Sequence, residues 1–153
     1  MKIEICWRAP IQLDDGTLEN LIYTHSSEIP DSPGIYIFAR KHGDTISPLY
    51  IGQTKSFSSR LKMQFNNTKL MKGIEKAPVG RRILLLGEVI PQRGQNIAKV
   101  LRTVETTLIE YCLANKADLI NIQGTRTNVD TITHTGSNSH KKLFPSLMSK
   151  KAR

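Results

Sequence analysis

Residues 34–52 read GIYIFARKHGDTISPLYIG. GIYIFA at 34–39 is rich in residues that favour strands, and PLYIG at 48–52 begins a second strand of the same character. KHGD at 41–44 lies between them and is typical of a turn. The stretch therefore predicts a β-hairpin in which Gly-Ile-Tyr on one strand is mirrored by Tyr-Ile-Gly on the other.

The hairpin brings two tyrosines together. Tyr36 and Tyr50 are equally far from Gly43, so a simple antiparallel register about that glycine places them opposite each other. Gly34 and Gly52 then share their face of the sheet and leave it open to a ligand. For a hairpin viewed in isolation, a Tyr-Tyr cross-strand pair that fills the core is the more common arrangement.

The segments next to the hairpin extend this pattern. Residues 3–8 alternate between apolar and polar side chains, which predicts an N-terminal strand. Apolar residues at every fourth position over 57–65 follow Ser56, which predicts a capped amphipathic helix that ends near Gly73. Residues 66–82 are expected to form a basic connector.

The second half of the chain predicts a buried strand at 83–90 and the longest helix at 96–114, followed by a short extended return at 119–121. Residues 128–133 are a further candidate strand. Together these elements predict an α+β fold, with a small, mostly antiparallel three-stranded sheet flanked by helices.

We expect one domain in three parts. Residues 1–29 form an N-terminal extension with its own strand, and residues 30–122 form the core. Residues 123–153 form a basic, Thr-, Ser- and Lys-rich C-terminal extension that is expected to be only partly ordered.

Length and composition narrow the class of protein. The 153 residues suit a single domain, and no apolar run is long enough to cross a bilayer, so we expect no membrane partner. Two cysteines make no disulfide framework, and an acid at Glu4 argues against a secretory leader, so we expect a cytoplasmic location. The net charge of +9 favours a polyanionic partner. It is concentrated after residue 33, because residues 1–33 hold six acidic and two basic side chains.

The residues downstream of the hairpin favour a functional role for the tyrosines. The chain resembles the GIY-YIG nuclease family at Tyr36 and Tyr50, and the resemblance continues at Arg60, at Glu105 in the longest helix, and at Asn121. The family's fold, a three-stranded antiparallel sheet flanked by helices, agrees with the fold that the residue pattern predicts.

The resemblance implies hydrolysis of DNA phosphodiester bonds with one divalent cation, Mg²⁺ or Mn²⁺. Glu105 would hold the metal, Arg60 would neutralise charge on the phosphorane, and Asn121 would support the sheet edge or the acid. One phenol, of Tyr36 or Tyr50, would orient or deprotonate the water.

The choice of acid can also be argued from the helix pattern. Glu105 lies on the inward flank of the apolar stripe, whereas Glu110 shares a face with threonines. An inward carboxylate needs a partner or a metal, and a salt bridge to Arg60 is the alternative to metal binding.

The sequence departs from some relatives at two positions. Gln53 stands where they have lysine, and Gln64 stands where they have histidine or tyrosine. Help with proton transfer would then come from elsewhere, and Lys55 and His134 are the candidates.

Basic side chains outside the tyrosine motifs are candidates for contacts with phosphates, and a solvated basic face is the alternative. They are Lys55, Lys69, Lys72, Lys76, Arg81 and Arg82. The expected partner is single-stranded, duplex or branched DNA, RNA is not excluded, and no obligate protein partner is inferred. The alternatives to the nuclease are a catalytically weak nucleic-acid-binding module and a toxin or antiviral effector with the same chemistry.

Overall fold

The computed structural model describes residues 2–16, 21–121 and 131–149, and these residues form an α+β fold. Seven of the described strands form one sheet in the order β6-β5-β7-β1-β8-β9, with β2 paired to β7. The strands of this sheet are β1 (Lys2–Trp7), β2 (Ile11–Gln12), β5 (Gly34–His42), β6 (Thr45–Thr54), β7 (Arg81–Ile90), β8 (Thr131–Gly136) and β9 (Leu147–Ser149). The remaining elements are the paired strands β3 (Asp14–Asp15) and β4 (Tyr23–Thr24), the helices α1 (Phe57–Phe65), α2 (Thr68–Lys76) and α3 (Ile97–Ala114), and the 3-10 helix η1 (Asn138–Lys142).

The three-stranded antiparallel unit exists as β6-β5-β7, but the expectation of a small sheet was wrong. On the far side of β7 the sheet continues through β1, which is antiparallel to β7 and parallel to β8. The sheet thus takes strands from all three predicted parts of the chain. The candidate strand at 128–133 appears as β8 from Thr131 onward. The first part of that candidate, and the prediction of a partly ordered extension at 123–130 and 150–153, lie outside the described residues.

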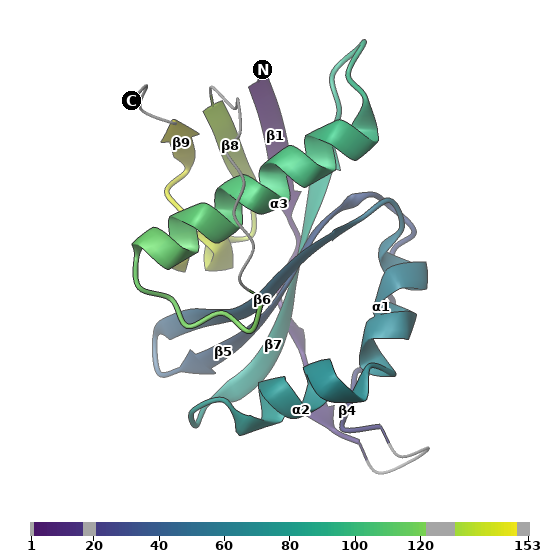
Figure 1. Ribbon diagram of the computed structural model, residues 1–153, viewed down its shortest axis with the longest axis vertical. Coiled ribbons are helices and arrows are strands. Elements are labelled where there is room, and N and C mark those ends of the chain that lie inside the picture. The colour runs from purple at the N-terminus through teal and green to yellow at the C-terminus, as the bar shows by residue number, and fades with distance from the viewer. Residues whose placement is uncertain (1, 17–20, 122–130, 150–153) are drawn as a thin grey trace.

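Side chains alternate along the hairpin strand β5 between two cores. Ile35 and Ile37 pack with β1, β8 and the buried stripe of α3. Tyr36 and Phe38 pack on the opposite face, with α1 and α2. Figure 1 shows α3 crossing one side of the sheet, with α1 and α2 at a distance from it. Strands covered on both faces are consistent with the nearly continuous burial of β5 and β7.

The segment between the hairpin and β7 contains two helices rather than one helix and a connector. Ser56 caps α1 as predicted, but α1 ends at Phe65 rather than near Gly73. Asn67 then caps α2, which buries Leu70, Met71 and Ile74 against the second core. The sequence did not predict α2, because the three apolar residues that it buries alternate with exposed lysines.

The predicted helix at 96–114 is confirmed as α3, with Asn96 as its N-cap. Within the described ranges, none of the helices has the length and apolar character that crossing a bilayer requires. Cys6 and Cys112 are free thiols.

Candidate active site at the edge of strand β6

Tyr36 and Tyr50 share a face of the sheet but do not lie opposite each other. Tyr36 is paired with Gly52, and Tyr50 is paired with Phe38. The predicted register was wrong because the turn has two central residues, Gly43 with φ 60° and Asp44, and because a bulge follows Phe38. The two phenol rings still stack diagonally, with their centroids 6.2 Å apart.

The glycines of the two motifs make room for side chains and backbone of the protein itself, not for a ligand. A Cβ atom on Gly52 would lie 2.3 Å from Cζ and 2.4 Å from the hydroxyl oxygen of Tyr36. A Cβ atom on Gly34 would lie 2.1 Å from the backbone oxygen of Gly87 and 2.5 Å from Cζ of Phe57. Gly52 therefore allows the Tyr36 ring to lie flat across β6, and Gly34 allows β7 and α1 to approach β5.

Gln64 of α1 joins the two phenols. Its buried amide Nε2 donates to the Tyr36 hydroxyl oxygen at 2.7 Å and to the Tyr50 hydroxyl oxygen at 3.4 Å. Arg60, one helical turn earlier, donates from Nε to the same Tyr36 oxygen at 3.4 Å. In the sequence, Gln64 stood out only as a departure from relatives. Its position, three residues after Leu61 and seven after Phe57, was the signal that could have placed it on the buried face of α1.

These contacts give the two tyrosines different environments. Tyr36 is only 1% exposed, and its burial raises the pKa of its phenol, against the lowering effect of the hydrogen bonds from Arg60 and Gln64. Tyr50 is half-buried. Tyr50 is therefore the phenol that a water molecule or a substrate reaches more easily.

Glu105 of α3 reaches this group at the free edge of the sheet. Its half-buried carboxylate accepts a hydrogen bond from the backbone of Gln53 and interacts electrostatically with Arg60 and Arg102. Desolvation by burial is the larger effect and raises the pKa of Glu105. The salt bridge to Arg60, which was the alternative to metal binding, does not form: Glu105 makes no ion pair with any described residue.

The edge of β6 is covered by α3 and the residues after it. The Asn121 side chain accepts from the backbone N–H of Ile51 at 3.2 Å and donates to the carbonyl oxygen of the same residue. The backbone N–H of Ile120 donates to the carbonyl of Leu49 at 2.7 Å. Asn121 thus supports the sheet edge, which is one of the two roles expected for it. Its hydrogen bonds also protect β6 from pairing with another chain.

An edge strand explains how residues from both cores meet. Tyr36, Tyr50 and Arg60 lie on the α1 side of the sheet, whereas Glu105 comes from the helix on the other side. Since none of the described strands lies beyond β6, Arg60 and Glu105 come within electrostatic range of each other around its edge. Electrostatic interactions connect Arg60 with both tyrosines and with Glu105.

The donor chemistry of the site fits a hard divalent cation. Glu105 supplies a carboxylate that no described cation neutralises by direct contact, and Mg²⁺ often binds through one or two carboxylates, with water and substrate phosphates as its other ligands. The described residues contain no group of three or more His, Cys, Asp or Glu side chains that could enclose a metal. Glu105 is therefore the residue that would hold Mg²⁺ or Mn²⁺.

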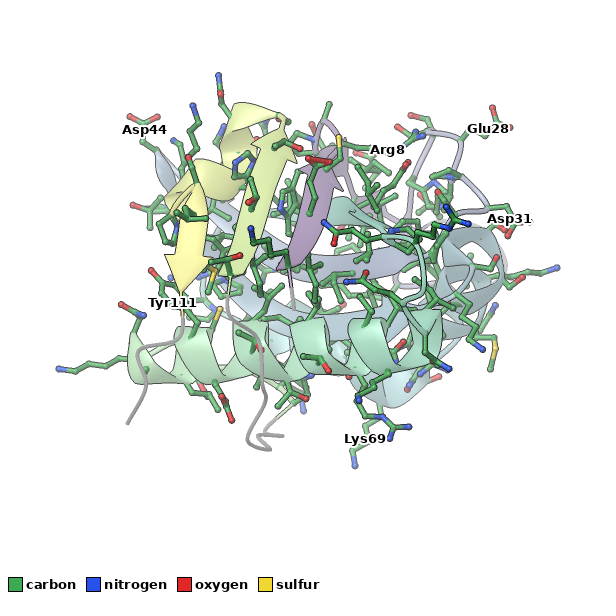
Figure 2. The ribbon with its side chains drawn as sticks, turned by 90° about the horizontal axis from the view of Figure 1, so that it is seen from above. Arg8, Glu28, Asp31, Asp44, Lys69 and Tyr111 are labelled. Carbon is green, nitrogen blue, oxygen red and sulfur yellow. The ribbon has the colours of Figure 1, made fainter. Side chains whose placement is uncertain are left out.

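Most of the predicted phosphate-contacting residues are on the surface. Lys69, Lys72 and Lys76 lie on the exposed face of α2, and Figure 2 shows Lys69 extending away from the ribbon. Lys55, at the end of β6, and Arg81, at the start of β7, are also exposed.

Arg82 is the exception, and its assignment to a phosphate contact was wrong. Arg82 is buried, and its five guanidinium N–H groups donate to five backbone carbonyls. Nε donates to Ile74, Nη1 to Pro78 and Gly80, and Nη2 to Glu75 and Ala77. The side chain therefore ties the C-terminal end of α2 to β7.

His134 does not belong to the site either. It lies on β8, four strands away from β6, which corresponds to about 19 Å at ~4.8 Å per strand. Its Nδ1 accepts from Nε1 of Trp7 at 2.9 Å, and its ring stacks on Phe144. His134 is a core residue, so the expectation that it transfers protons in the reaction was wrong.

The buried histidine predicts acid sensitivity. Burial, with a smaller contribution from His140, lowers the pKa of His134 to about 4. The unfolded chain takes up the proton below its ordinary pKa of ~6.5, whereas the folded chain does not, so stability falls as the pH drops from ~6.5 to ~4. The free energy of unfolding is expected to fall by about 3 kcal/mol over this pH range. Urea unfolding at several pH values measures it. His134→Gln, which keeps an acceptor for Trp7, is expected to flatten the dependence, and an equal pH dependence in the two proteins would contradict the assignment.

Comparison of the chain with models of known protein families gives no match. No curated protein matches it, and no solved structure matches it.

Proposed function

We propose that the protein is a divalent-metal-dependent endonuclease that hydrolyses DNA phosphodiester bonds. The observation that carries the proposal is the convergence of Tyr36, Tyr50, Arg60 and Glu105 on one edge of β6, from elements that belong to both cores. A phosphoryl-transfer site needs these three kinds of group: a cationic fork, a carboxylate for a metal, and a group that orients water.

Each side chain has a distinct role in this proposal. Arg60 binds a non-bridging phosphate oxygen and neutralises the charge that develops there. Tyr50, the more exposed phenol, orients the attacking water, and Tyr36 and Gln64 hold Tyr50 and Arg60 in place. A cation held by Glu105 supplies Lewis-acid stabilisation of the phosphate and of the leaving oxygen.

Cleavage assays test the proposal directly. Supercoiled plasmid and labelled single-stranded, duplex, nicked and branched DNA, together with RNA, are incubated with Mg²⁺ or Mn²⁺ and, in parallel, with EDTA. We expect metal-dependent cleavage of at least one DNA form. Absence of cleavage on every form, at protein concentrations where binding is complete, would contradict the enzyme.

The second candidate is a nucleic-acid-binding module without catalysis. One observation favours it: Glu105 accepts a backbone hydrogen bond from Gln53, so part of its role is to cover the sheet edge. Such a module binds nucleic acid equally well with and without a divalent cation, and cleaves none of the substrates.

The exposed lysines of α2 predict a measurable salt dependence. Each neutralised phosphate contributes about 0.7 to 0.9 to the slope of log affinity against log salt. Replacing Lys69, Lys72 and Lys76 together with glutamine is therefore expected to flatten the slope by about 2 to 3, measured by fluorescence anisotropy. The control removes three exposed lysines elsewhere on the surface: Lys2, Lys99 and Lys141. Equal slopes in the α2 variant and in the wild type would remove α2 from the binding surface.

A further inference from the structure

A hollow with a volume of about 580 Å³ lies at the other end of β6 from Glu105. The first residues of β6, the C-terminal end of α2, and the end of α3 with the residues that follow it form its walls. Figure 2 shows Tyr111, one of its lining residues, on the side of the molecule opposite Asp31, which bonds to the N-cap of α1. Its lining includes four basic side chains and one acidic one: Arg40, Lys76, Lys116, Lys142 and Asp118.

Of the four basic side chains, Lys76 and Lys116 are fully available to a ligand, whereas Arg40 and Lys142 already donate to backbone carbonyls. Arg40 donates to the carbonyl of Val79, and Lys142 donates to the carbonyl of Asp44. Lys76 and Lys116 are exposed, and neither side chain forms a hydrogen bond or ion pair with a described residue.

Neither lysine is needed to bind the free carbonyls at a helix end. Lys76 is the last residue of α2, and Lys116 follows the end of α3. Arg82 already binds the carbonyls at the end of α2. Backbone N–H groups of residues 115–117 bind the last carbonyls of α3. The ammonium groups therefore do not replace a missing hydrogen bond of the fold, and they give the hollow a positive charge that a polyanion would neutralise.

Two independent measures give the distance from this hollow to Glu105. Along β6, Leu49 in the hollow is four residues from Gln53, or about 14 Å at ~3.4 Å per residue. Along α3, the lining residues run from Tyr111 to Asn115, six to ten residues from Glu105, or about 9 to 15 Å at ~1.5 Å per residue. Because one strand of B-form DNA advances ~3.4 Å per nucleotide along the helix axis, these separations correspond to about three to four nucleotides.

We propose that the hollow binds the phosphodiester backbone of DNA about three to four nucleotides away from the phosphate that Arg60 and Glu105 would bind. The identity of the ligand rests on the proposed function. The geometry also gives the path of the bound DNA strand, which follows the edge of β6 from the reaction site at Gln53 to the hollow at Leu49.

Replacing Lys116 with glycine allows a test in which DNA binding is expected to weaken while thermal stability increases. The φ of Lys116 is 63°, in the left-handed region, where it ends α3 at a position that favours glycine. Lys116→Gly is therefore expected to raise the Tm by about 2 to 4 °C. The same variant is expected to flatten the salt slope for a duplex of about 20 base pairs by about 0.9, since it loses one phosphate contact.

The slopes are measured by anisotropy in EDTA, so that no cleavage interferes. Lys76→Gln is a second variant with the same expected change in slope and no change of backbone geometry. Lys116→Arg keeps the charge and is expected to keep the slope. Lys99→Gln removes a charge near the opposite end of α3 and is also expected to keep it.

The outcomes separate this proposal from the proposed function. Wild-type slopes in both Lys116→Gly and Lys76→Gln would overturn the hollow as a binding site, even if the protein cleaves DNA. Flattened slopes in both variants would support the hollow, even if metal-dependent cleavage is never observed. Absence of any DNA binding by the wild-type protein would overturn both.

Discussion

Replacing Glu105 with glutamine is expected to reduce DNA cleavage by about 10³-fold or more, which corresponds to about 4 kcal/mol of lost transition-state stabilisation. Glutamine keeps an acceptor for the hydrogen bond from Gln53 but removes the charge that would hold the cation. Binding of DNA in EDTA is expected to be unchanged or tighter, because one negative charge leaves the site.

The fold is expected to tolerate this substitution. Burial raises the pKa of Glu105, so the folded state binds the proton more tightly than the unfolded state does, and the charged form costs stability. Glu105→Gln should therefore leave the urea midpoint equal to or above that of the wild type.

The matched control is Glu110→Gln on the same helix. Its position differs from that of Glu105 by about 140° around the helix axis, at ~100° per residue. We expect this variant to retain cleavage. Full activity in Glu105→Gln together with loss of activity in Glu110→Gln would show that the wrong acid has been assigned.

Replacing Arg82 with methionine is expected to destabilise the protein by about 3 kcal/mol and to lower its Tm by about 6 to 12 °C. Methionine keeps the apolar stem but removes all five hydrogen bonds to the carbonyls of residues 74–80. Part of the loss is recovered by water, because this loop lies near the surface. Chemical unfolding measures the free energy.

Two further variants make the Arg82 prediction specific. Arg82→Lys keeps the positive charge but has three donors and no planar fork, so an intermediate loss is expected. Arg81→Gln removes the exposed neighbouring charge and should change stability by no more than about 0.5 kcal/mol. Equal stability of Arg82→Met and the wild type would contradict the structural role.

Elements with a strong local pattern could be predicted from the sequence. The Ser56 cap, the apolar stripe of α3 and the β-rich run of β7 each depend on residues within a few positions of one another. The hairpin could be predicted for the same reason, but its register could not. One residue in the turn and one bulge each change which residues face each other.

The mirrored tyrosine motifs, the basic charge and the order of the main elements could all be read from the sequence without the structure. The tertiary structure alone decided that β8, with its polar residues TITHTG, pairs with β1 more than 120 residues earlier, since no local pattern specifies a distant partner. The contacts of individual side chains likewise depend on the tertiary structure. Arg82 is buried by the carbonyls at the end of α2, and Gln64 is held between two phenols. Glu105 lies within electrostatic range of Arg60, although the two side chains come from opposite faces of the sheet, because both lie near the edge of β6.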